Sequence, residues 1–289
     1  MNFNNLVLNK KYNIYQFSLN WLKNLIIADV NTDKPPGIVK RLYSVWYRHY
    51  KVYTKKLLSN SFPPFTEPLV FLAGMGLGLG GYIANVDNTP YIRYLAMVLP
   101  LSSAMFSAAF ECSYGTFFRM EFSKTYEGML IGPLSVTDLF LGEILWCGTK
   151  GAFYASAVLL VFIACDTVPI TWGLLLVPLV GCIVGLMFGG FSLLFVSFVK
   201  TMNSLNFYMS GVLMPLFMFS GIMFPVTNLP KVLQWIVEAF PLVHAVRLQL
   251  AICKNEFSYS LIFDLVYCVV FIGLFAWLST RKLKAKLMK

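Results

Sequence analysis

Side chains that could carry out chemistry are few in this sequence. A carboxylate, an imidazole and a guanidinium follow one another at Glu238, His244 and Arg247, and such a trio could transfer protons in a membrane-embedded enzyme that acts on lipid. The sequence has no HExxH or GxSxG motif, so a zinc or serine hydrolase is not indicated. Its six dispersed cysteines and two histidines lack the spacing of a zinc site.

Glycines form two patterned runs. Residues 76–81 formally match GxGxxG, but this run is apolar and follows no strand, so it does not indicate a dinucleotide site. Small residues four apart instead predict close helix packing, at Gly74, Gly76, Gly78, Gly80, Gly181, Gly185 and Gly189. No Gly-Lys-Ser/Thr occurs. We therefore expect no nucleotide, metal or other cofactor on this chain.

Two charges interrupt otherwise apolar runs, Glu111 and Lys150. A charge inside a membrane is costly and should face protein or water. The two could form a structural ion pair or line a polar path, and Lys150 could also reach the membrane surface with its long side chain. With so few carboxylates inside the apolar runs, a proton relay of several carboxylates is not indicated.

The composition predicts the elements that position these groups. Of 289 residues, 58% are hydrophobic and 12% charged, whereas a soluble domain has about 25% charged residues. The fold class is therefore an all-α polytopic membrane protein, because a span needs about 20 largely apolar residues. A transmembrane domain over 62–280 follows a segment, 1–61, with a basic amphipathic helix, and precedes a basic tail, 281–289. Its six predicted spans are 64–84, 94–118, 144–165, 172–199, 204–224 and 259–280.

The distribution of Lys and Arg predicts the orientation. The chain has 23 Lys and Arg against 13 Asp and Glu, a net charge of +10. Most of the basic residues precede the first span, follow the last, or lie in loops on that same side, which places both termini in the cytoplasm. We therefore attribute the excess charge to topology and anionic lipid, not to nucleic acid.

Two connections between spans are unusual. The stretch 119–143 is polar and faces the cytoplasm, with a new helix cap at Ser135 to Asp138; it is either a solvated connector or a docking segment. The stretch 214–250 is too short for two spans and predicts an outer re-entrant hairpin, with Pro225, Pro230, Glu238, Pro241 and His244. The sequence leaves open whether Cys165 and Cys253 form a disulfide.

Short segments in a fixed order carry a resemblance to a known family. They are Glu67-Pro68-Leu69 with the glycine run to Gly81, Lys124 to Leu130, Pro133-Leu134-Ser135, Gly142 to Trp146, Pro215 to Pro225, and Pro241 to His244. In this order the chain resembles the ABC-2 type permeases, the membrane subunits of ATP-binding-cassette exporters. It is most similar to the branch that exports nodulation factors, which are lipooligosaccharides.

The resemblance implies a permease homodimer in a bacterial inner membrane, in contact with lipid and with a separate ATPase subunit that binds ATP and Mg. It implies export of a lipid-linked or lipidated saccharide; a drug or small lipid is an alternative cargo that the sequence does not exclude. The family's coupling helix, which contacts the ATPase, would contain Lys124, Thr125, Tyr126, Glu127 and Pro133. The hairpin after the fifth span would close the exit.

Overall fold

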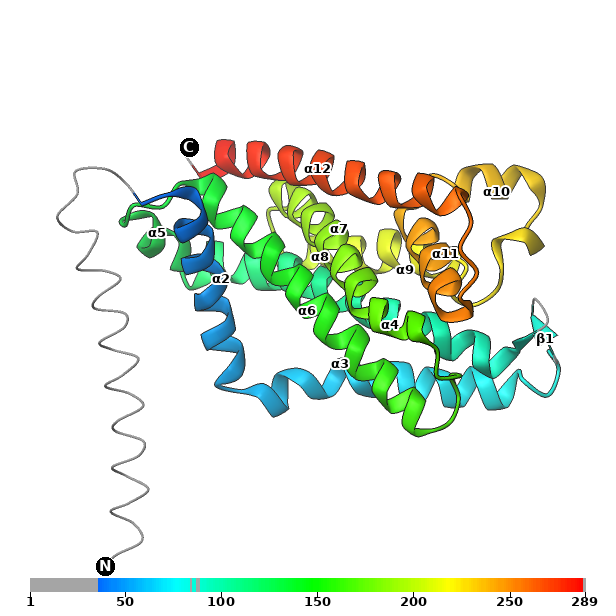
Figure 1. The fold of residues 1–289 in the computed structure, drawn as a ribbon. Coiled ribbons are helices and arrows are strands. Elements are labelled where there is room, and N and C mark those ends of the chain that lie inside the picture. Colours follow the sequence, from blue (N-terminus) through cyan, green and yellow to red (C-terminus); the bar gives the residue numbers. More distant parts are fainter. Residues whose placement is uncertain (1–35, 84, 87–88, 288–289) are drawn as a thin grey trace, which may run out of the picture. The chain divides into compact units, whose positions relative to one another are not determined.

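A computed structural model describes residues 36–83, 85–86 and 89–287, and these residues are mostly helical (Figure 1). The chain divides into two compact units, Met1–Arg41 and Leu42–Lys289. The described part of the first unit is residues 36–41. Helix α2 (Ile38–Thr54) begins in the first unit and continues into the second, which contains all the other described elements.

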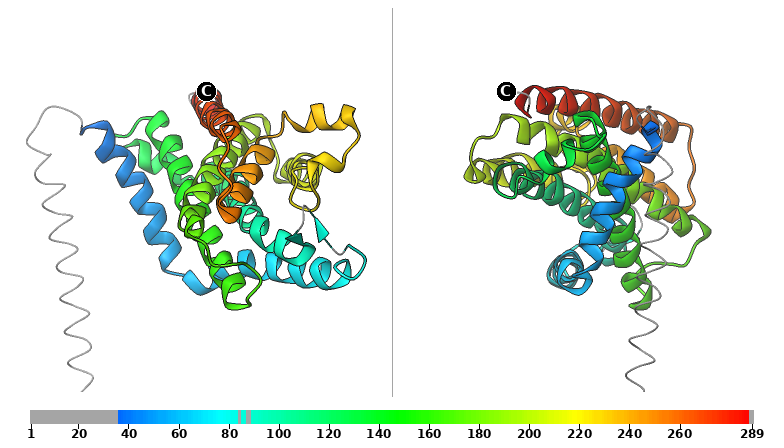
Figure 2. Two further views of the ribbon diagram at one scale, coloured as in Figure 1. Left: turned by 45° about the vertical axis from the view of Figure 1, so that its right-hand side comes forward. Right: turned by 90° about the vertical axis from the view of Figure 1, so that its left-hand side faces the viewer.

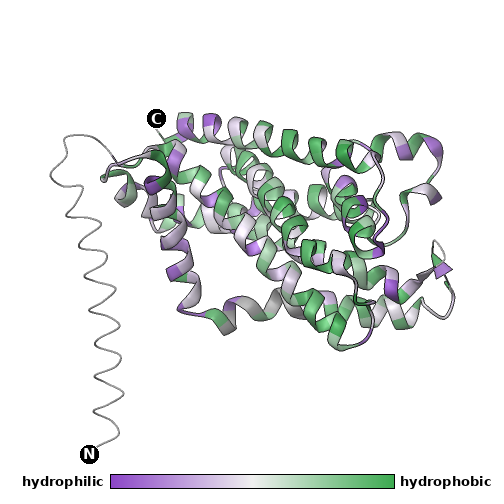
Figure 3. Cartoon of the chain, in the orientation of Figure 1, coloured by the Kyte–Doolittle hydropathy of each residue, from purple (hydrophilic) through white to green (hydrophobic). Residues whose placement is uncertain are grey.

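Four helical stretches are long and apolar enough to cross a membrane. They are Tyr91–Phe122, which joins α4 (Tyr91–Phe110), η2 (Glu111–Gly115) and η3 (Phe118–Phe122); α6 (Val136–Ala164); Trp172–Phe198, which joins η4 (Trp172–Leu176) and α7 (Val177–Phe198); and α12 (Ser260–Leu287). Helix α7 packs between α6 and α12 (Figure 2). Hydrophobic residues dominate α7 and α12 (Figure 3).

The four stretches differ in how far the chain itself covers them. In the apolar 18-residue stretch within Tyr91–Phe122, 89% is buried inside the chain. In the corresponding stretch within Ser260–Leu287, only 17% is buried. Helix α4 therefore forms the centre of the core, where it contacts α6 and α7. Helix α12 leaves most of its apolar surface for lipid or for another chain.

The other two predicted spans are helical but interrupted. The first, 64–84, corresponds to α3 (Leu57–Phe71) and the π-helical η1 (Leu72–Leu77). The fifth predicted span, 204–224, corresponds to α8 (Met202–Phe207), the π-helical η5 (Tyr208–Leu213) and α9 (Met214–Met218). Neither is among the four long stretches, so a count of six stays a prediction. In the part of the chain that the structure describes, two short strands also occur: β1 (Asn85–Val86) and β2 (Thr89–Pro90) pair antiparallel.

The connector between the second and third predicted spans is shorter than the sequence indicated. Helix η3 extends to Phe122 and α6 begins at Val136, so only residues 123–135 connect them, with the short helix α5 (Thr125–Leu130). Ser135 caps α6 as predicted: its Oγ accepts from the Asp138 amide at 3.1 Å, and the Asp138 carboxylate accepts from the Ser135 amide at 2.9 Å. Arg119 and Glu143 therefore lie on helices, not in the connector.

The segment predicted as a hairpin contains η6 (Val226–Asn228), α10 (Lys231–Val237) and α11 (Pro241–Lys254). Pro225 and Pro230 immediately precede the first two helices, and Pro241 is the first residue of α11. Proline suits these positions because its fixed φ fits a helix start and its missing N–H leaves no unpaired donor. Helices α10 and α11 are bent by 94° against each other, the geometry of either a broken span or a re-entrant loop.

Glycines allow α6 and α7 to approach closely. A Cβ at Gly185 would lie 2.3 Å from the Cys147 carbonyl oxygen, and one at Gly181 would lie 2.5 Å from the Ala155 Cβ. Gly189 also faces Cys147, at 3.0 Å.

The earlier glycine run behaves differently. A Cβ at Gly76 would meet Ile92 at 3.0 Å, and one at Gly80 would meet only the Gly76 carbonyl. A Cβ at Gly74 or Gly78 would meet nothing within 4 Å among the described residues, so close helix packing at these two glycines would need another chain.

We predict that Gly185→Ala destabilises the protein, because the new methyl group would overlap the backbone of α6. Overpacking of this kind costs about 1–3 kcal/mol. Gly273→Ala on α12 is the matched control, since its Cβ would meet nothing within 4 Å and alanine favours a helix by about 1 kcal/mol. Thermal unfolding in detergent should show a lower midpoint for the first variant only. Equal midpoints would contradict this packing.

Candidate functional site

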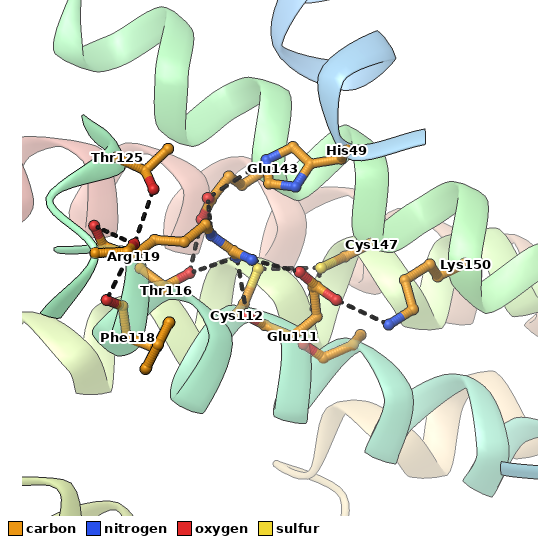
Figure 4. Close-up of polar contacts among 12 residues, drawn as sticks. His49, Glu111, Cys112, Thr116, Phe118, Arg119, Thr125, Glu143, Cys147 and Lys150 are labelled. Carbon is orange, nitrogen blue, oxygen red and sulfur yellow. Dashed lines mark hydrogen bonds and ion pairs between the residues drawn. The ribbon is translucent and has the colours of Figure 1, made fainter. Parts of the chain in front are cut away.

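Glu111 and Lys150 form an ion pair. The Lys150 Nζ lies 2.9 Å from the Glu111 Oε2 (Figure 4). Glu111 begins the π-helical η2, and Lys150 lies midway along α6. The Lys150 ammonium also lies 5.4 Å from the centre of the Tyr53 ring and 5.8 Å from that of Tyr154, where an aromatic face stabilises a cation.

Arg119 joins this pair to a second carboxylate. Its Nη1 donates to the Glu111 Oε1 at 2.7 Å, and its Nε donates to the Glu143 Oε1 at 3.0 Å. The guanidinium thus bridges η2 and α6 with separate nitrogens, which only arginine can do at this geometry. Gly115 leaves the space for it, since a Cβ there would lie 3.2 Å from the Arg119 Nη1.

Glu143 is fully buried and is the centre of the second half of the cluster. Its Oε2 accepts from the Thr116 hydroxyl at 2.7 Å, and its Oε1 accepts from the Tyr126 hydroxyl. The His49 Nε2 lies 3.5 Å from the same Oε1. Three segments distant in sequence (α2, α5 and the helix that contains Thr116) therefore meet at one carboxylate.

The charges of this cluster cancel. We call Glu111, Arg119, Glu143 and Lys150 the charge cluster; it contains two carboxylates and two cations, and each carboxylate contacts at least one cation. Removal of one partner from a buried ion pair leaves an uncompensated charge, which is strongly destabilising. The cluster therefore fixes the spacing of η2, η3 and α6.

Tyr126 ties the connector to the charge cluster. It is buried, its hydroxyl also accepts from the Arg119 Nε at 3.1 Å, and its ring packs edge-on against Phe140. Burial, together with the neighbouring Glu143 carboxylate, raises the pKa of the Tyr126 hydroxyl well above its usual value. The hydroxyl consequently keeps its proton and remains a hydrogen-bond donor.

The other predicted coupling residues lie on the open side of the connector. Lys124 and Glu127 are exposed and pair with each other at 3.1 Å. Pro133 is exposed in the bend that follows α5, and Ile131 beside it is 89% exposed. Thr125 is half-buried and its hydroxyl lies 2.8 Å from that of Ser123. Only Tyr126 among the five predicted residues points into the bundle.

A second polar cluster contains the trio that the sequence analysis singled out. Arg247 binds the Glu238 carboxylate through two bonds of 2.7 and 2.8 Å. The His244 Nδ1 lies 2.6 Å from the Asp264 Oδ1, and Arg247 contacts the same carboxylate at 2.8 Å. The Tyr267 ring stacks on the His244 ring, with the two ring centres 3.8 Å apart. These bonds tie the segment after α10 and helix α11 to α12.

The remaining predicted features involve cysteines and metals. Cys165 and Cys253 are free thiols. The Cys112 and Cys147 sulfurs lie 3.0 Å apart between η2 and α6, also unoxidised. In the described part of the chain, no group of three His, Cys, Asp or Glu side chains could hold a metal ion.

Sequence reasoning missed Arg119, Glu143, His49 and Asp264 as members of these clusters. Arg119 and Glu143 fell at the two ends of the stretch 119–143, which the sequence predicts to be a solvated connector or a docking segment. One signal was present: Glu143 and Lys150 are seven residues apart, which is two helical turns and hence one face. His49 gave no such signal, because its partner lies on another helix.

Apolar helices long enough to cross a membrane, closed around a charge-neutral polar cluster, define a helical multi-pass membrane protein. Residues 5–281 match the family described as ABC-2 family transporter protein. The chain belongs to this family, and it is a transport subunit rather than an enzyme.

Individual relatives agree with this assignment. Nodulation protein J of Bradyrhizobium diazoefficiens is 33% identical over 71% of this chain and 78% of its own length. Nodulation protein J of Rhizobium leguminosarum bv. trifolii is 30% identical over 88% of this chain and 97% of its own length. The inner membrane transport permease YadH of Escherichia coli is 22% identical over 71% of this chain and 79% of its own length.

We predict that Lys150→Met alone is more destabilising than Lys150→Met combined with Glu111→Gln. The single change leaves one negative charge of the cluster uncompensated, since Arg119 alone must then balance two carboxylates, at a cost of about 3–5 kcal/mol; the double change keeps the cluster neutral. Thermal unfolding of the wild type, both single variants and the double variant gives the interaction energy. Additive effects would show that the two charges do not interact.

Proposed function

We propose that this chain is the membrane-spanning permease subunit of an ATP-driven exporter that moves a lipid-linked or lipidated saccharide across or out of a bacterial inner membrane. One observation carries the proposal. Helix α5 has an exposed face, with Glu127, and a buried face, with Tyr126 bonded to Arg119 and Glu143. A force applied to the exposed face would reach the long helices through these bonds.

The energy would come from a separate ATPase subunit, which binds ATP and Mg. This chain has no Walker A sequence of its own, and membership of the ABC-2 family supports such a partner. The exposed Ile131 next to Pro133 supports docking at the connector, because an apolar residue on a polar surface is a common anchor of an interface. The remaining exposed groups of α5 would set the specificity for the partner.

The mechanism requires two packing states of a permease homodimer. ATP binding would bring two ATPase subunits together and displace both connectors. Because Tyr126 and the charge cluster join α5 to η2, η3 and α6, these elements would move as one body, and the interface between the two permeases would repack. The difference in binding free energy between the two states drives such a change. The apolar surface that α12 leaves uncovered supports a second copy beside it.

The proposed topology has six spans, with both termini and the connector in the cytoplasm. The Lys and Arg distribution supports this orientation. The helices α3 with η1, and α8 with η5 and α9, would provide the two spans beyond the four long stretches. Helices α10 and α11 would form a re-entrant hairpin that closes the outer exit, held by the bonds of Arg247 and His244 to Asp264.

The saccharide cargo is supported by the resemblance to the lipooligosaccharide exporters and by the relatives that are named nodulation protein J. A drug or small lipid is the alternative. Stimulation of ATP hydrolysis in the reconstituted complex separates the two: a lipooligosaccharide should stimulate it, and an apolar drug of similar size should not.

We predict that Glu127→Lys prevents co-purification of the ATPase subunit from mild detergent. The change reverses the charge of the exposed face of α5 without removing any bond inside the bundle, since Glu127 pairs only with Lys124 in the described residues. Glu256→Lys in the loop between α11 and α12 is the control, because Glu256 is also exposed. Unchanged co-purification and transport would refute the docking role.

We predict that Tyr126→Phe keeps the ATPase bound but lowers the transport rate for each ATP hydrolysed. Phenylalanine retains the packing against Phe140 and loses only the hydroxyl that bonds Glu143 and Arg119. Each of these two hydrogen bonds to a charged group contributes about 1.5–3 kcal/mol, so their loss is enough to loosen α5. Transport in proteoliposomes, divided by phosphate released, measures the effect. An unchanged ratio would contradict force transfer through this bond.

A further inference from the structure

The charge cluster borders a cavity of about 660 Å³. Residues of α2, η2, η3 and α6 line it, together with residues of α3, α8 and the connector. Its polar wall contains Arg48, His49, Glu111, Arg119 and Lys150. A volume of this size is typical of a site for a small molecule or a headgroup.

The charges on this wall do not cancel. Glu111 and Glu143 balance Arg119 and Lys150 within the charge cluster, but Arg48 is an additional cation. In the described residues Arg48 forms no ion pair, although it is half-buried. Burial, and then the positive charge of Arg119, lower the pKa of the Arg48 guanidinium from its ordinary value. The wall therefore has one uncompensated positive charge in a partly dehydrated place.

The cations next to the cavity are also accessible from it. Lys150 and Arg119 retain 11% and 14% of their side-chain exposure, and the Glu111 carboxylate that pairs with both retains 18%. Glu143 is fully buried, so the accessible charges are three cations, with Arg48, and one carboxylate. The Tyr53 and Asn60 side chains add polar groups to the same wall. An anion in the cavity would thus meet Arg48 directly and would lie near two further cations.

Apolar side chains also line the cavity. They are Val52, Phe118, Trp146 and Met202. Phe118 and Met202 are 51% and 37% exposed, so they offer apolar surface. A cavity lined by both cationic and apolar side chains fits an amphiphile, because each part of such a molecule finds a matching surface.

We propose that this cavity binds the phosphate group of an anionic amphiphile, with Arg48 as the principal contact. Arginine suits a phosphate because its planar guanidinium can donate two parallel bonds to it. The apolar side chains of the lining would accept the part of the lipid next to the phosphate. This site does not depend on the identity of the cargo or on the ATPase partner, so it can be tested on the permease alone.

The test measures tryptophan fluorescence of the full chain in phosphatidylcholine nanodiscs, with increasing fractions of brominated phosphatidylglycerol. Bromine quenches a nearby indole, and Trp146 lines the cavity. We expect brominated phosphatidylglycerol to quench at a lower mole fraction than brominated phosphatidylcholine. Trp146→Phe should remove this difference, which assigns the signal to the cavity among the six tryptophans of the chain.

Variants of α2 decide the role of Arg48. Arg48→Gln should raise the required fraction of phosphatidylglycerol about tenfold, as expected for the loss of one charge-assisted bond, while Arg48→Lys should restore most of the binding. Lys51→Gln is the control, because Lys51 is exposed on the same helix and does not line the cavity. An unchanged thermal midpoint verifies that Arg48→Gln folds.

Three results would overturn the proposal. Equal quenching by the two brominated lipids would show that the cavity has no preference for an anionic lipid. Equal quenching of the wild type and Arg48→Gln would show that Arg48 is not the contact. The third result is complete reversal of the quenching by inorganic phosphate, under conditions where a chloride salt of equal ionic strength has no effect. It would show that phosphate itself, and not an amphiphile, occupies the site.

Discussion

The structure depends on the neutralisation of buried charge within the chain. Glu143 is fully buried, and a carboxylate in that position is tolerated only when a cation and hydrogen-bond donors surround it. Arg119 supplies the cation for both Glu143 and Glu111, while Lys150 completes the balance. This requirement fixes the relative positions of η2, η3 and α6, and through Tyr126 it fixes the connector as well.

The rest of the bundle preserves this arrangement by close packing. Gly151 on α6 lies against Gly181 and Gly185 on α7, so that two backbones touch directly. Such contacts leave little freedom for sliding, because any side chain larger than hydrogen would collide. Under the proposed mechanism, a displacement of the connector would consequently be passed to long helices instead of being absorbed locally. At the far end of the same bundle, Asp264 holds α11 through His244 and Arg247.

The sequence predicted the helical membrane class, the four long stretches and the cap at Ser135, because these follow from local signals: charge-free runs and a side chain next to its own helix. It did not predict which charges meet. The sequence predicts that the third span begins at 144, which leaves Glu143 in the connector. Helix α6 in fact begins at Val136, so Glu143 lies within it. Arg119 reaches two carboxylates across a π-helical stretch, and His49 meets its partner across helices, neither of which a pattern along the chain encodes.

The central claim is that α5 and α6 move as one body when ATP binds to the partner subunit. The most direct measurement is the distance between spin labels at Ile131, at the end of the connector helix, and Leu160, on the lipid-facing part of α6; both positions are exposed, and the native cysteines are replaced first. The account predicts the same distance distribution in the nucleotide-free and ATP-bound complex, while the distance between the two Ile131 labels of a dimer changes. A shift of several ångströms between Ile131 and Leu160 would contradict it.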